Sequence, residues 1–295
     1  MNEVFDGVIT ALVTPFSRGE VDEVSFVKLL YHQIEGGVSG LVINGTTAES
    51  PTLKVDEVKR LFQIAKGEVG NRVRLVVGTG TNSTSATVEF TQQAEKWGAE
   101  AALVVVPYYN RPPQRGLLAH FSTVAKNTKL PVLIYNVPTR TSCSIEMSTV
   151  AKLAEEKNIV GIKEATGKLE FLKDLKAIKR QSETFWLLSG DDATGVEFCA
   201  RGGHGIISVV SNLIPGPLSE LVKKARNGDS SAGSAYQIFK DLLRWLYIEA
   251  NPIPAKWALA EMGIIASSEM RLPLVPLEDE HAKGFRTCLQ NLKLI

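Results

Sequence analysis

Short, nearly continuous apolar runs alternate along the chain with longer amphipathic stretches. Strands that are buried on both faces need such continuous hydrophobicity, whereas a half-exposed strand alternates apolar and polar residues. The runs begin roughly one βα unit apart. We therefore expect eight buried strands, at Val8–Val13, Leu41–Asn44, Leu75–Gly78, Ala102–Val106, Val132–Asn136, Ile159–Lys163, Trp186–Ser189 and Ile206–Val210.

The stretches between these runs have apolar residues at helical spacing, which predicts amphipathic helices that cover the strands. Glycines at Gly36–Gly37 and at Gly67 are expected to end the first two helices, because glycine is a poor helix residue. The apolar positions that define four of the helices are Val27, Leu30, Tyr31 and Ile34; Val55, Val58, Phe62 and Ala65; Leu117, Phe121 and Val124; and Leu172, Leu175 and Ile178.

Strict βα alternation indicates an α/β protein with a parallel sheet, and eight units indicate a closed (β/α)8 TIM barrel. A doubly wound open sheet is the alternative. The barrel should be complete near residue 226, so we expect a catalytic barrel over residues 1–226 and a C-terminal helical segment over residues 227–295. Helical spacing recurs there at Tyr236–Ala250 and Ala255–Met262. This segment should pack on the barrel or on a neighbouring subunit.

Composition narrows the function classes. The 295 residues include 33 basic and 32 acidic side chains, a net charge of +1, without the basic block that nucleic-acid binding would favour. We expect no membrane span and no signal peptide, because the apolar runs are too short and the N-terminus lacks a basic region before them. Three separated cysteines and four scattered histidines favour neither a disulfide framework nor a metal site, and a reducing compartment, the cytoplasm, is expected.

TIM barrels carry their active sites at the carboxyl ends of the strands, so candidate chemistry is sought there. Lys163 continues the sixth buried run and, alternating with Ile162, should point into the barrel. An amine removed from water loses its proton more readily and becomes a nucleophile toward carbonyl groups. The alternatives are an ion pair with Asp191 or Glu164, or a side chain that reaches outward at the rim.

Other strand ends offer groups that would assist such an amine. Tyr135 lies near the end of the fifth run and should lie beside Lys163, where its phenol could move protons during imine formation. Arg140 follows and could bind a substrate carboxylate, or be an ordinary surface arginine. Thr46–Thr47 follow the second run as ligand groups or as helix caps. Tyr108–Tyr109, after the fourth run, form either part of the site or an interface patch.

The motifs occur in an order that resembles the dihydrodipicolinate synthase family, within the pyruvate-dependent class I aldolases. The resemblance runs the length of the chain. It rests on Gly45-Thr46-Thr47 with Glu49-Ser50, Pro107-Tyr108-Tyr109-Asn110-Arg111-Pro112, Tyr135-Asn136-Val137-Pro138 with Arg140-Thr141, Gly161-Ile162-Lys163-Glu164-Ala165-Thr166-Gly167, Ser189-Gly190-Asp191-Asp192 and Asn251-Pro252-Ile253-Pro254-Ala255-Lys256.

The resemblance implies condensation of pyruvate with L-aspartate-4-semialdehyde, without a metal or other cofactor, in the pathway to diaminopimelate and lysine. Lys163 would form the imine with pyruvate. The proton relay would be Thr47, Tyr135 and Tyr109, with Tyr109 supplied by a neighbouring subunit of a homo-oligomer, usually a dimer of dimers. Substrate contacts would come from Thr46 and Thr47 to the pyruvate carboxylate, from Arg140 to the semialdehyde carboxylate, and from the carbonyl of Ile207, which would face the lysine.

Departures from the family pattern are also visible. Ala48 and Ser142 stand where the family usually has glycine, so the loop geometry matters if either position has a positive φ. Many members are inhibited by lysine at the dimer interface, through an acid at the position of Ala86 and histidine or aromatic residues at Val55 and Val58. These three residues are apolar here, which predicts weak or absent inhibition by lysine.

Two other functions share part of this pattern. An aldolase for N-acetylneuraminate or a 2-keto-3-deoxy sugar acid would keep the lysine and the strand-five tyrosine. However, Thr46–Thr47, Tyr108–Tyr109 and Arg140 favour the semialdehyde enzyme. A barrel that only binds a keto acid would leave Lys163 unmodified by pyruvate and borohydride.

Overall fold

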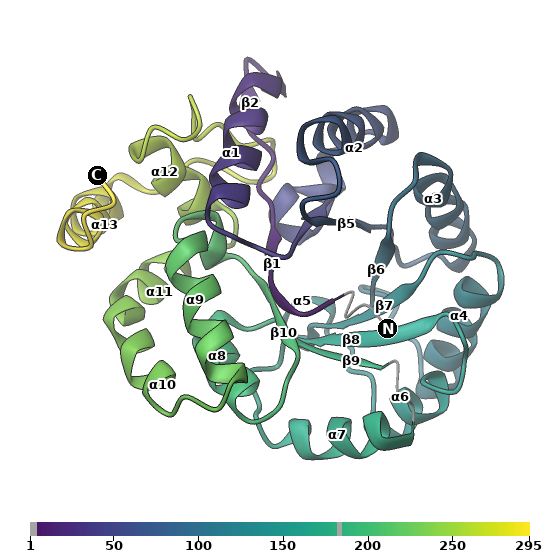
Figure 1. The fold of residues 1–295 in the computed structure, drawn as a ribbon. Coiled ribbons are helices and arrows are strands. Elements are labelled where there is room, and N and C mark those ends of the chain that lie inside the picture. Colours follow the sequence, from purple (N-terminus) through teal and green to yellow (C-terminus); the bar gives the residue numbers. More distant parts are fainter. Residues whose placement is uncertain (1–4, 182–184) are drawn as a thin grey trace.

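A computed structural model describes residues 5–181 and 185–295. Eight parallel strands close into a barrel in the order β1-β10-β9-β8-β7-β6-β5-β4, so the barrel prediction is confirmed and the open sheet is wrong (Figure 1). Every predicted strand is present, with ends that shift by at most two residues. The strands are β1 Gly7–Ala11, β4 Gly40–Ile43, β5 Arg74–Gly78, β6 Ala101–Val105, β7 Val132–Asn136, β8 Ile159–Glu164, β9 Trp186–Ser189 and β10 Gly205–Ser208.

Helices surround the strands (Figure 1). Asp22 and Ser83 cap two of them, each accepting a hydrogen bond from a backbone N–H of the first turn. The first predicted end is confirmed, because α1 stops before Gly36. The end at Gly67 is wrong: α2 continues to Val69, and Gly70, with φ of 56°, ends it. The barrel helices are α1 Glu23–Glu35, α2 Val55–Val69, α3 Thr84–Trp97, α4 Gln114–Lys126, the short α5 Pro138–Thr141, α6 Met147–Leu153, α7 Phe171–Gln181, α8 Asp192–Ala200 and α9 Pro215–Arg226.

Strand alternation divides the apolar residues into two clusters. One fills the layer between strands and helices and includes Ile134 and Ile162. The other lies inside the barrel and includes Leu133, Tyr135 and Ile207. Because successive strand residues point to opposite faces, the neighbour of Ile162 in β8, Lys163, belongs to the interior face.

The C-terminal segment differs in detail from its prediction. The structure has α10 Ser231–Tyr236, α11 Lys240–Leu246, α12 Ile253–Glu261 and α13 Asp279–Asn291. The predicted helix over Tyr236–Ala250 is therefore wrong in its extent, since Tyr247 has already left helical geometry with φ of −118°. The helix over Ala255–Met262 is confirmed as α12. Helix α13 and a small hairpin, β2 Phe16–Ser17 with β3 Glu20–Val21, had not been predicted.

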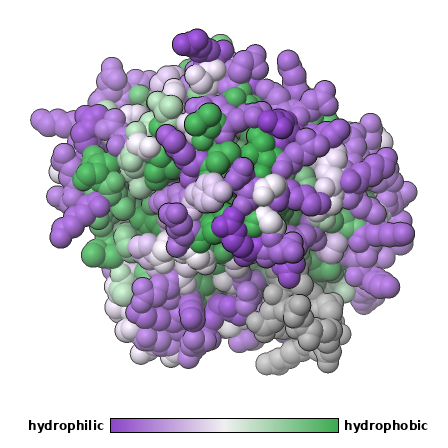
Figure 2. Space-filling view, turned by 45° about the horizontal axis from the view of Figure 1, so that its top comes forward, coloured by the Kyte–Doolittle hydropathy of each residue, from purple (hydrophilic) through white to green (hydrophobic). Residues whose placement is uncertain are grey.

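Hydrophilic residues dominate the face shown in Figure 2, and hydrophobic residues gather in patches between them. Across residues 5–181 and 185–295, no helix combines the length and apolarity that crossing a bilayer requires.

Candidate active site

Lys163 and Tyr135 lie side by side inside the barrel. They are paired residues in the register of β8 and β7, and the Lys163 Nζ atom is 4.2 Å from the centroid of the Tyr135 ring. Lys163 is only 5% exposed. The prediction that adjacent strands place the phenol ring beside the amine is confirmed.

The alternative interpretations of Lys163 are wrong. In the described part of the chain, no carboxylate oxygen lies within ion-pair distance of its amine. Glu164 instead accepts hydrogen bonds from Asn136 Nδ2 at 2.8 Å and from the Thr166 backbone N–H at 2.7 Å. Burial raises the pKa of Glu164, and these two hydrogen bonds oppose the shift. Asp191 accepts from the Thr194 N–H and hydroxyl at the start of α8.

Gly190 provides the space that the Lys163 side chain occupies. A Cβ atom at Gly190 would lie 2.7 Å from Lys163 Cε and 2.6 Å from Ala165 Cβ, closer than real Cβ contacts. The backbone N–H of Gly190 also donates to the Glu164 carbonyl at 2.7 Å, which ties the end of β9 to β8. The sequence motif contains this glycine, but only the packing reveals that a side chain there would displace the lysine.

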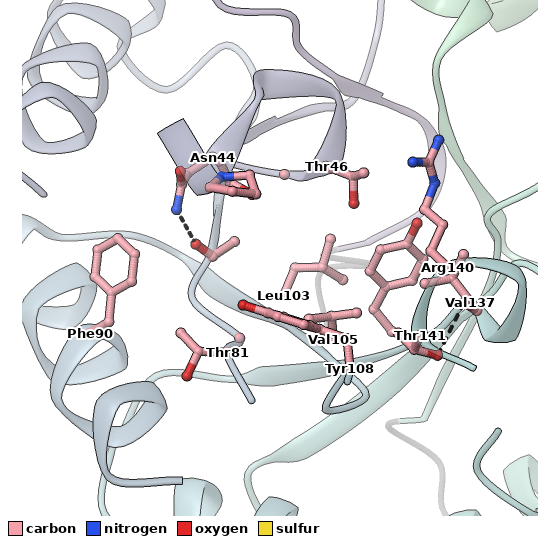
Figure 3. A pocket seen from close by; sticks show the side chains of 16 residues that line it. Asn44, Thr46, Thr81, Phe90, Leu103, Val105, Tyr108, Val137, Arg140 and Thr141 are labelled. Carbon is pink, nitrogen blue, oxygen red and sulfur yellow. Dashed lines mark hydrogen bonds between the residues drawn. The ribbon is translucent and has the colours of Figure 1, made fainter. Parts of the chain in front are cut away.

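A cavity of about 380 Å³ opens beside this pair. Its wall includes the candidates Thr46, Tyr135 and Arg140. Lys163 is not part of the wall, but its amine lies against the ring of Tyr135, which is. Figure 3 shows Thr46 and Arg140 toward one end of the cavity and Thr81 and Phe90 toward the other. A pocket with hydroxyl groups and a guanidinium in its wall and a buried amine next to that wall suits a small ligand with a carbonyl group and a carboxylate.

The Thr46–Thr47 turn is held from the C-terminal segment. The two threonines form a 3-10 turn, Thr46–Ala48, whose N-cap is Gly45 and carries no side-chain hydrogen bond, so the helix-cap alternative is wrong. Thr47 is 2% exposed, and its hydroxyl oxygen accepts a hydrogen bond from Asn251 Nδ2 at 2.9 Å. Sequence reasoning had assigned no role to Asn251, because nothing local links residues so far apart.

The two departures from glycine have different structural consequences. Ala48 is not among the residues with positive φ; that conformation falls on the next residue, Glu49, with φ of 58°. Alanine therefore fits its turn. Ser142 has φ of 51° and ends α5 in the left-handed region that favours glycine.

Arg140 lies on α5, exposed at the cavity wall. Within the described residues it forms no ion pair with an acidic side chain, so its guanidinium is available to a carboxylate ligand. Figure 3 shows it extending from α5 past the cavity. Ile207, in the centre of β10, is 1% exposed and packs in the same interior cluster as Tyr135. Whether its carbonyl faces the amine stays a prediction.

The two adjacent tyrosines point to different places. Tyr108 lines the cavity, whereas Tyr109 is 89% exposed, has φ of 71° and is not part of the wall. Tyr109 thus does not serve the cavity of its own chain, and its role from a neighbouring subunit stays a prediction. Of the residues expected to weaken lysine binding, Val58 is buried in the core, whereas Val55 and Ala86 are exposed.

No group of three or more His, Cys, Asp or Glu side chains is placed to hold a metal ion in the described ranges. Cys143, Cys199 and Cys288 are free thiols. Burial raises the pKa of Cys199 to about 12, so this thiol stays protonated and unreactive.

Known proteins of one family match this chain over nearly its whole length. The model of the dihydrodipicolinate synthetase family matches residues 4–292. The chain is 49% identical over 278 residues to the 4-hydroxy-tetrahydrodipicolinate synthase of Bdellovibrio bacteriovorus, covering 94% of each. It resembles the dihydrodipicolinate synthase structure of Thermotoga maritima, with a TM-score of 0.96 and 39% identity over 99% of this chain and 100% of the other. A chloride-inhibited synthase from Acinetobacter baumannii, solved in complex with pyruvate, gives a TM-score of 0.94 and 38% identity over 98% and 99% of the two chains.

Proposed function

The chain belongs to the dihydrodipicolinate synthetase family, and from this premise we propose that its barrel mouth condenses pyruvate with L-aspartate-4-semialdehyde through the amine of Lys163. The activity is that of a 4-hydroxy-tetrahydrodipicolinate synthase, in the pathway to diaminopimelate and lysine. One observation supports the role of Lys163 most directly. Its amine is buried over the Tyr135 ring, beside the cavity and without a carboxylate partner in the described residues.

The reaction begins when the Lys163 nitrogen attacks the ketone carbon of pyruvate. Loss of water gives an imine, whose positive charge makes the methyl protons acidic enough to be removed at neutral pH. The resulting enamine carbon attacks the aldehyde carbon of the semialdehyde and forms the new carbon–carbon bond. The substrate amino group then displaces Lys163 at the imine carbon, which closes the ring and frees the enzyme. The lysine supplies the electron sink, so we propose that no metal or other cofactor takes part.

Hydroxyl groups around the lysine would carry the protons. Tyr135 lies against the amine, and Thr47, buried in the turn after β4, joins it in the proposed relay. Thr46 and Thr47 would bind the pyruvate carboxylate, and Arg140 would bind the carboxylate of the semialdehyde through paired N–H groups. The carbonyl of Ile207 would face the amine.

A complete site would need a second chain. Tyr109, the third member of the proposed relay, is not part of the cavity wall of its own subunit and is 89% exposed. We therefore propose a homo-oligomer in which each Tyr109 reaches a neighbour's cavity, with a dimer of dimers as the full assembly. With three free thiols and small-metabolite substrates, the cytoplasm is the proposed location.

The decisive experiment is borohydride reduction in the presence of pyruvate, followed by intact-mass and peptide analysis. Trapped imine should add about 72 Da, which is pyruvate less water plus two hydrogens, on the peptide that contains Lys163. Lys163→Arg should abolish trapping and lower kcat by roughly 10³-fold or more. Lys168→Arg, an exposed lysine of the following loop, is the matched control and should leave both unchanged.

Two results would contradict the proposal. One is normal turnover of Lys163→Arg, and the other is modification of a different lysine. Steady-state assays with pyruvate and each candidate aldehyde separately test the second substrate. Efficient use of a sugar aldehyde in place of the semialdehyde would indicate the related aldolase activity.

A further inference from the structure

The amide of Asn251 reaches from the C-terminal segment into the proposed relay. Asn251 Nδ2 donates to Thr47 Oγ1 at 2.9 Å, between residues 204 positions apart, and both residues are buried. A threonine hydroxyl has one proton to donate and accepts through its oxygen. When its oxygen accepts from Asn251, the Thr47 proton is left for another acceptor, which in the proposed relay is a tyrosine hydroxyl.

A buried ion pair holds the same turn at its other end. Lys256 Nζ lies 2.7 Å from Glu49 Oε1, and neither side chain has any solvent exposure. Burial lowers the pKa of Lys256, and the negative charge of Glu49 opposes that shift. The second oxygen of Glu49 accepts from the Arg271 backbone N–H at 2.9 Å, while Lys256 also donates to the Glu269 carbonyl. Glu49 is the residue with φ of 58° that directly follows Thr46–Ala48.

An aromatic ring completes this arrangement. Phe16 is fully buried, with Lys256 Nζ at 4.2 Å and the Arg271 guanidinium carbon at 4.3 Å from its ring centroid. Arg271 in turn pairs with Glu57 of α2 at 2.6 Å. Residues 49, 256 and 271 are therefore fixed on several sides, which leaves little freedom for the turn that carries Thr47.

The segment that contains Asn251 has a second attachment to the barrel mouth. The Tyr247 hydroxyl donates to Asp192 Oδ2 at 3.0 Å, and the Tyr236 hydroxyl donates to the Asp192 carbonyl at 2.9 Å. Asp192 begins α8 directly after β9, a strand that β10 and β1 separate from β4 in the closed barrel. The chain from Tyr247 to Lys256 thus spans between the ends of β9 and β4.

We propose that Asn251 is a positioning residue for the relay: its amide, held in place by the neighbouring Lys256–Glu49 pair, directs the Thr47 hydroxyl proton toward the reacting groups. This inference rests on the proposed function. It assigns a catalytic task to the C-terminal segment, which otherwise looks like an appendage packed on the barrel.

The test replaces the donor with an acceptor of the same shape. The carboxylate of Asn251→Asp would accept from Thr47 and turn its proton away from the relay. We expect kcat of the condensation to fall by about 10-fold or more, because misdirecting one hydroxyl forfeits part of an acid–base contribution that is typically about 10²- to 10⁴-fold. The KM for pyruvate should change by less than about 3-fold, and borohydride trapping at saturating pyruvate should remain complete, because Lys163 is untouched.

A double-mutant cycle separates this role from simple loosening. In a Thr47→Val background the hydroxyl is gone, so Asn251→Asp should lower kcat by no more than about 2-fold further. If Asn251→Asp does not fold, Asn251→Ala takes its place. It should lower kcat in the wild-type background but have little further effect in the Thr47→Val background. Tyr247→Phe, which removes another hydrogen bond of the same segment, is the control and should keep kcat near the wild-type value.

Three outcomes overturn the inference. Unchanged kcat of the Asn251 variant means that its amide does not direct Thr47. If Asn251→Asp lowers kcat equally in the wild-type and Thr47→Val backgrounds, Asn251 only supports the fold. The same conclusion follows if the KM rises as much as kcat falls. Each variant is compared with a wild-type enzyme that has been shown to condense both substrates. Failure of that wild-type reaction would instead contradict the proposed function.

Discussion

At the scale of single residues, the site depends on two features around Lys163: no carboxylate of the described residues pairs with its amine, and the neighbouring Gly190 has no side chain. Among the described residues Lys163 has no carboxylate partner, because Asn136 engages Glu164 and the α8 N-terminus engages Asp191. Burying an ammonium without a partner is unfavourable, so this arrangement favours chemistry on the amine over a structural role. Gly190 leaves the space in which that amine is held.

Gly190→Ala should therefore impair the first chemical step. The added methyl group would meet Lys163 Cε at 2.7 Å and displace the amine. Small displacements of reacting groups cost up to about 100-fold in rate, so we expect kcat/KM for pyruvate to fall roughly 10- to 100-fold, with slower borohydride trapping. Gly67→Ala in α2, where a Cβ would meet nothing within 4 Å, is the matched control and should keep full activity. Normal trapping in Gly190→Ala would refute the steric argument.

At Ser142 we expect a substitution to improve the protein by raising its free energy of unfolding. Its φ of 51° is unfavourable for a residue with a side chain, and that side chain is exposed. Ser142→Gly should stabilise the protein by about 0.5–1 kcal/mol, since the relieved strain exceeds the entropy that glycine adds to the unfolded chain. Denaturant unfolding measures the difference. The same change at Ser144, which lacks a positive φ, should stabilise nothing, and equal effects at both positions would contradict the argument.

At the scale of elements, strand register determines which groups meet. The pairing of β7 with β8 sets Tyr135 opposite Lys163, and a shift of either strand by one residue would turn its side chain toward the helices. Helix packing sets a second interaction, between α3 and α4. His120 of α4 is buried, and its Nδ1 atom lies 2.9 Å from the Thr84 hydroxyl of α3.

This helix contact predicts a pH dependence of stability. Burial lowers the pKa of His120 to about 4, from an ordinary value of 6.5. Between those values the unfolded chain binds the proton more readily, so the free energy of unfolding decreases as pH falls through this window. Relative to His120→Gln, the wild type should lose roughly 2–3 kcal/mol between pH 7.5 and 4.5.

Denaturant midpoints of both proteins at the two pH values measure this difference. His32, whose pKa burial also lowers, acts in the same direction but is present in both proteins and cancels. The raised pKa values of Glu164 and Asp192 act in the opposite direction and cancel likewise. Parallel pH profiles for the wild type and the variant would show that His120 is not the group responsible.

At the scale of the whole molecule, one chain presents a cavity and, separately, an exposed tyrosine. Tyr109 lies on the loop after β6 with φ of 71° and 89% exposure, an unfavourable position for an aromatic side chain that meets only water. An exchange of tyrosines between two subunits would resolve this, because a two-fold axis makes each chain both donor and recipient.

Subunit complementation tests that exchange. Lys163→Arg and Tyr109→Phe chains, each impaired alone, are co-expressed with different tags and the hybrids are assayed. If Tyr109 acts on the neighbour's cavity, each hybrid dimer holds one complete site of its two, and the isolated hybrids should show about half of wild-type activity. If Tyr109 acted within its own chain, hybrids would show only the sum of the two parents.

By itself, the sequence determined the strands, the barrel and the lysine, because the signals for these are local. Eight apolar runs predict β1 and β4 to β10 without knowledge of how they pair, and alternation within one strand directs Lys163 inward. The resemblance of the motifs also assigned the family, which the comparisons confirmed. Local signals failed at the end of α11, where Tyr247 leaves helical geometry and its hydroxyl donates to the distant Asp192.

Only the tertiary structure decided which distant residues support the site. Asn251 and Thr47 are 204 positions apart, and Lys256 and Glu49 are 207 positions apart. No periodicity spans such separations, because each contact depends on barrel closure and on the path of the chain after α9. The same holds for Gly190, whose missing side chain matters only once β8 and β9 bring Lys163 against it. Local patterns specify elements, whereas packing between elements specifies the contacts that position their side chains.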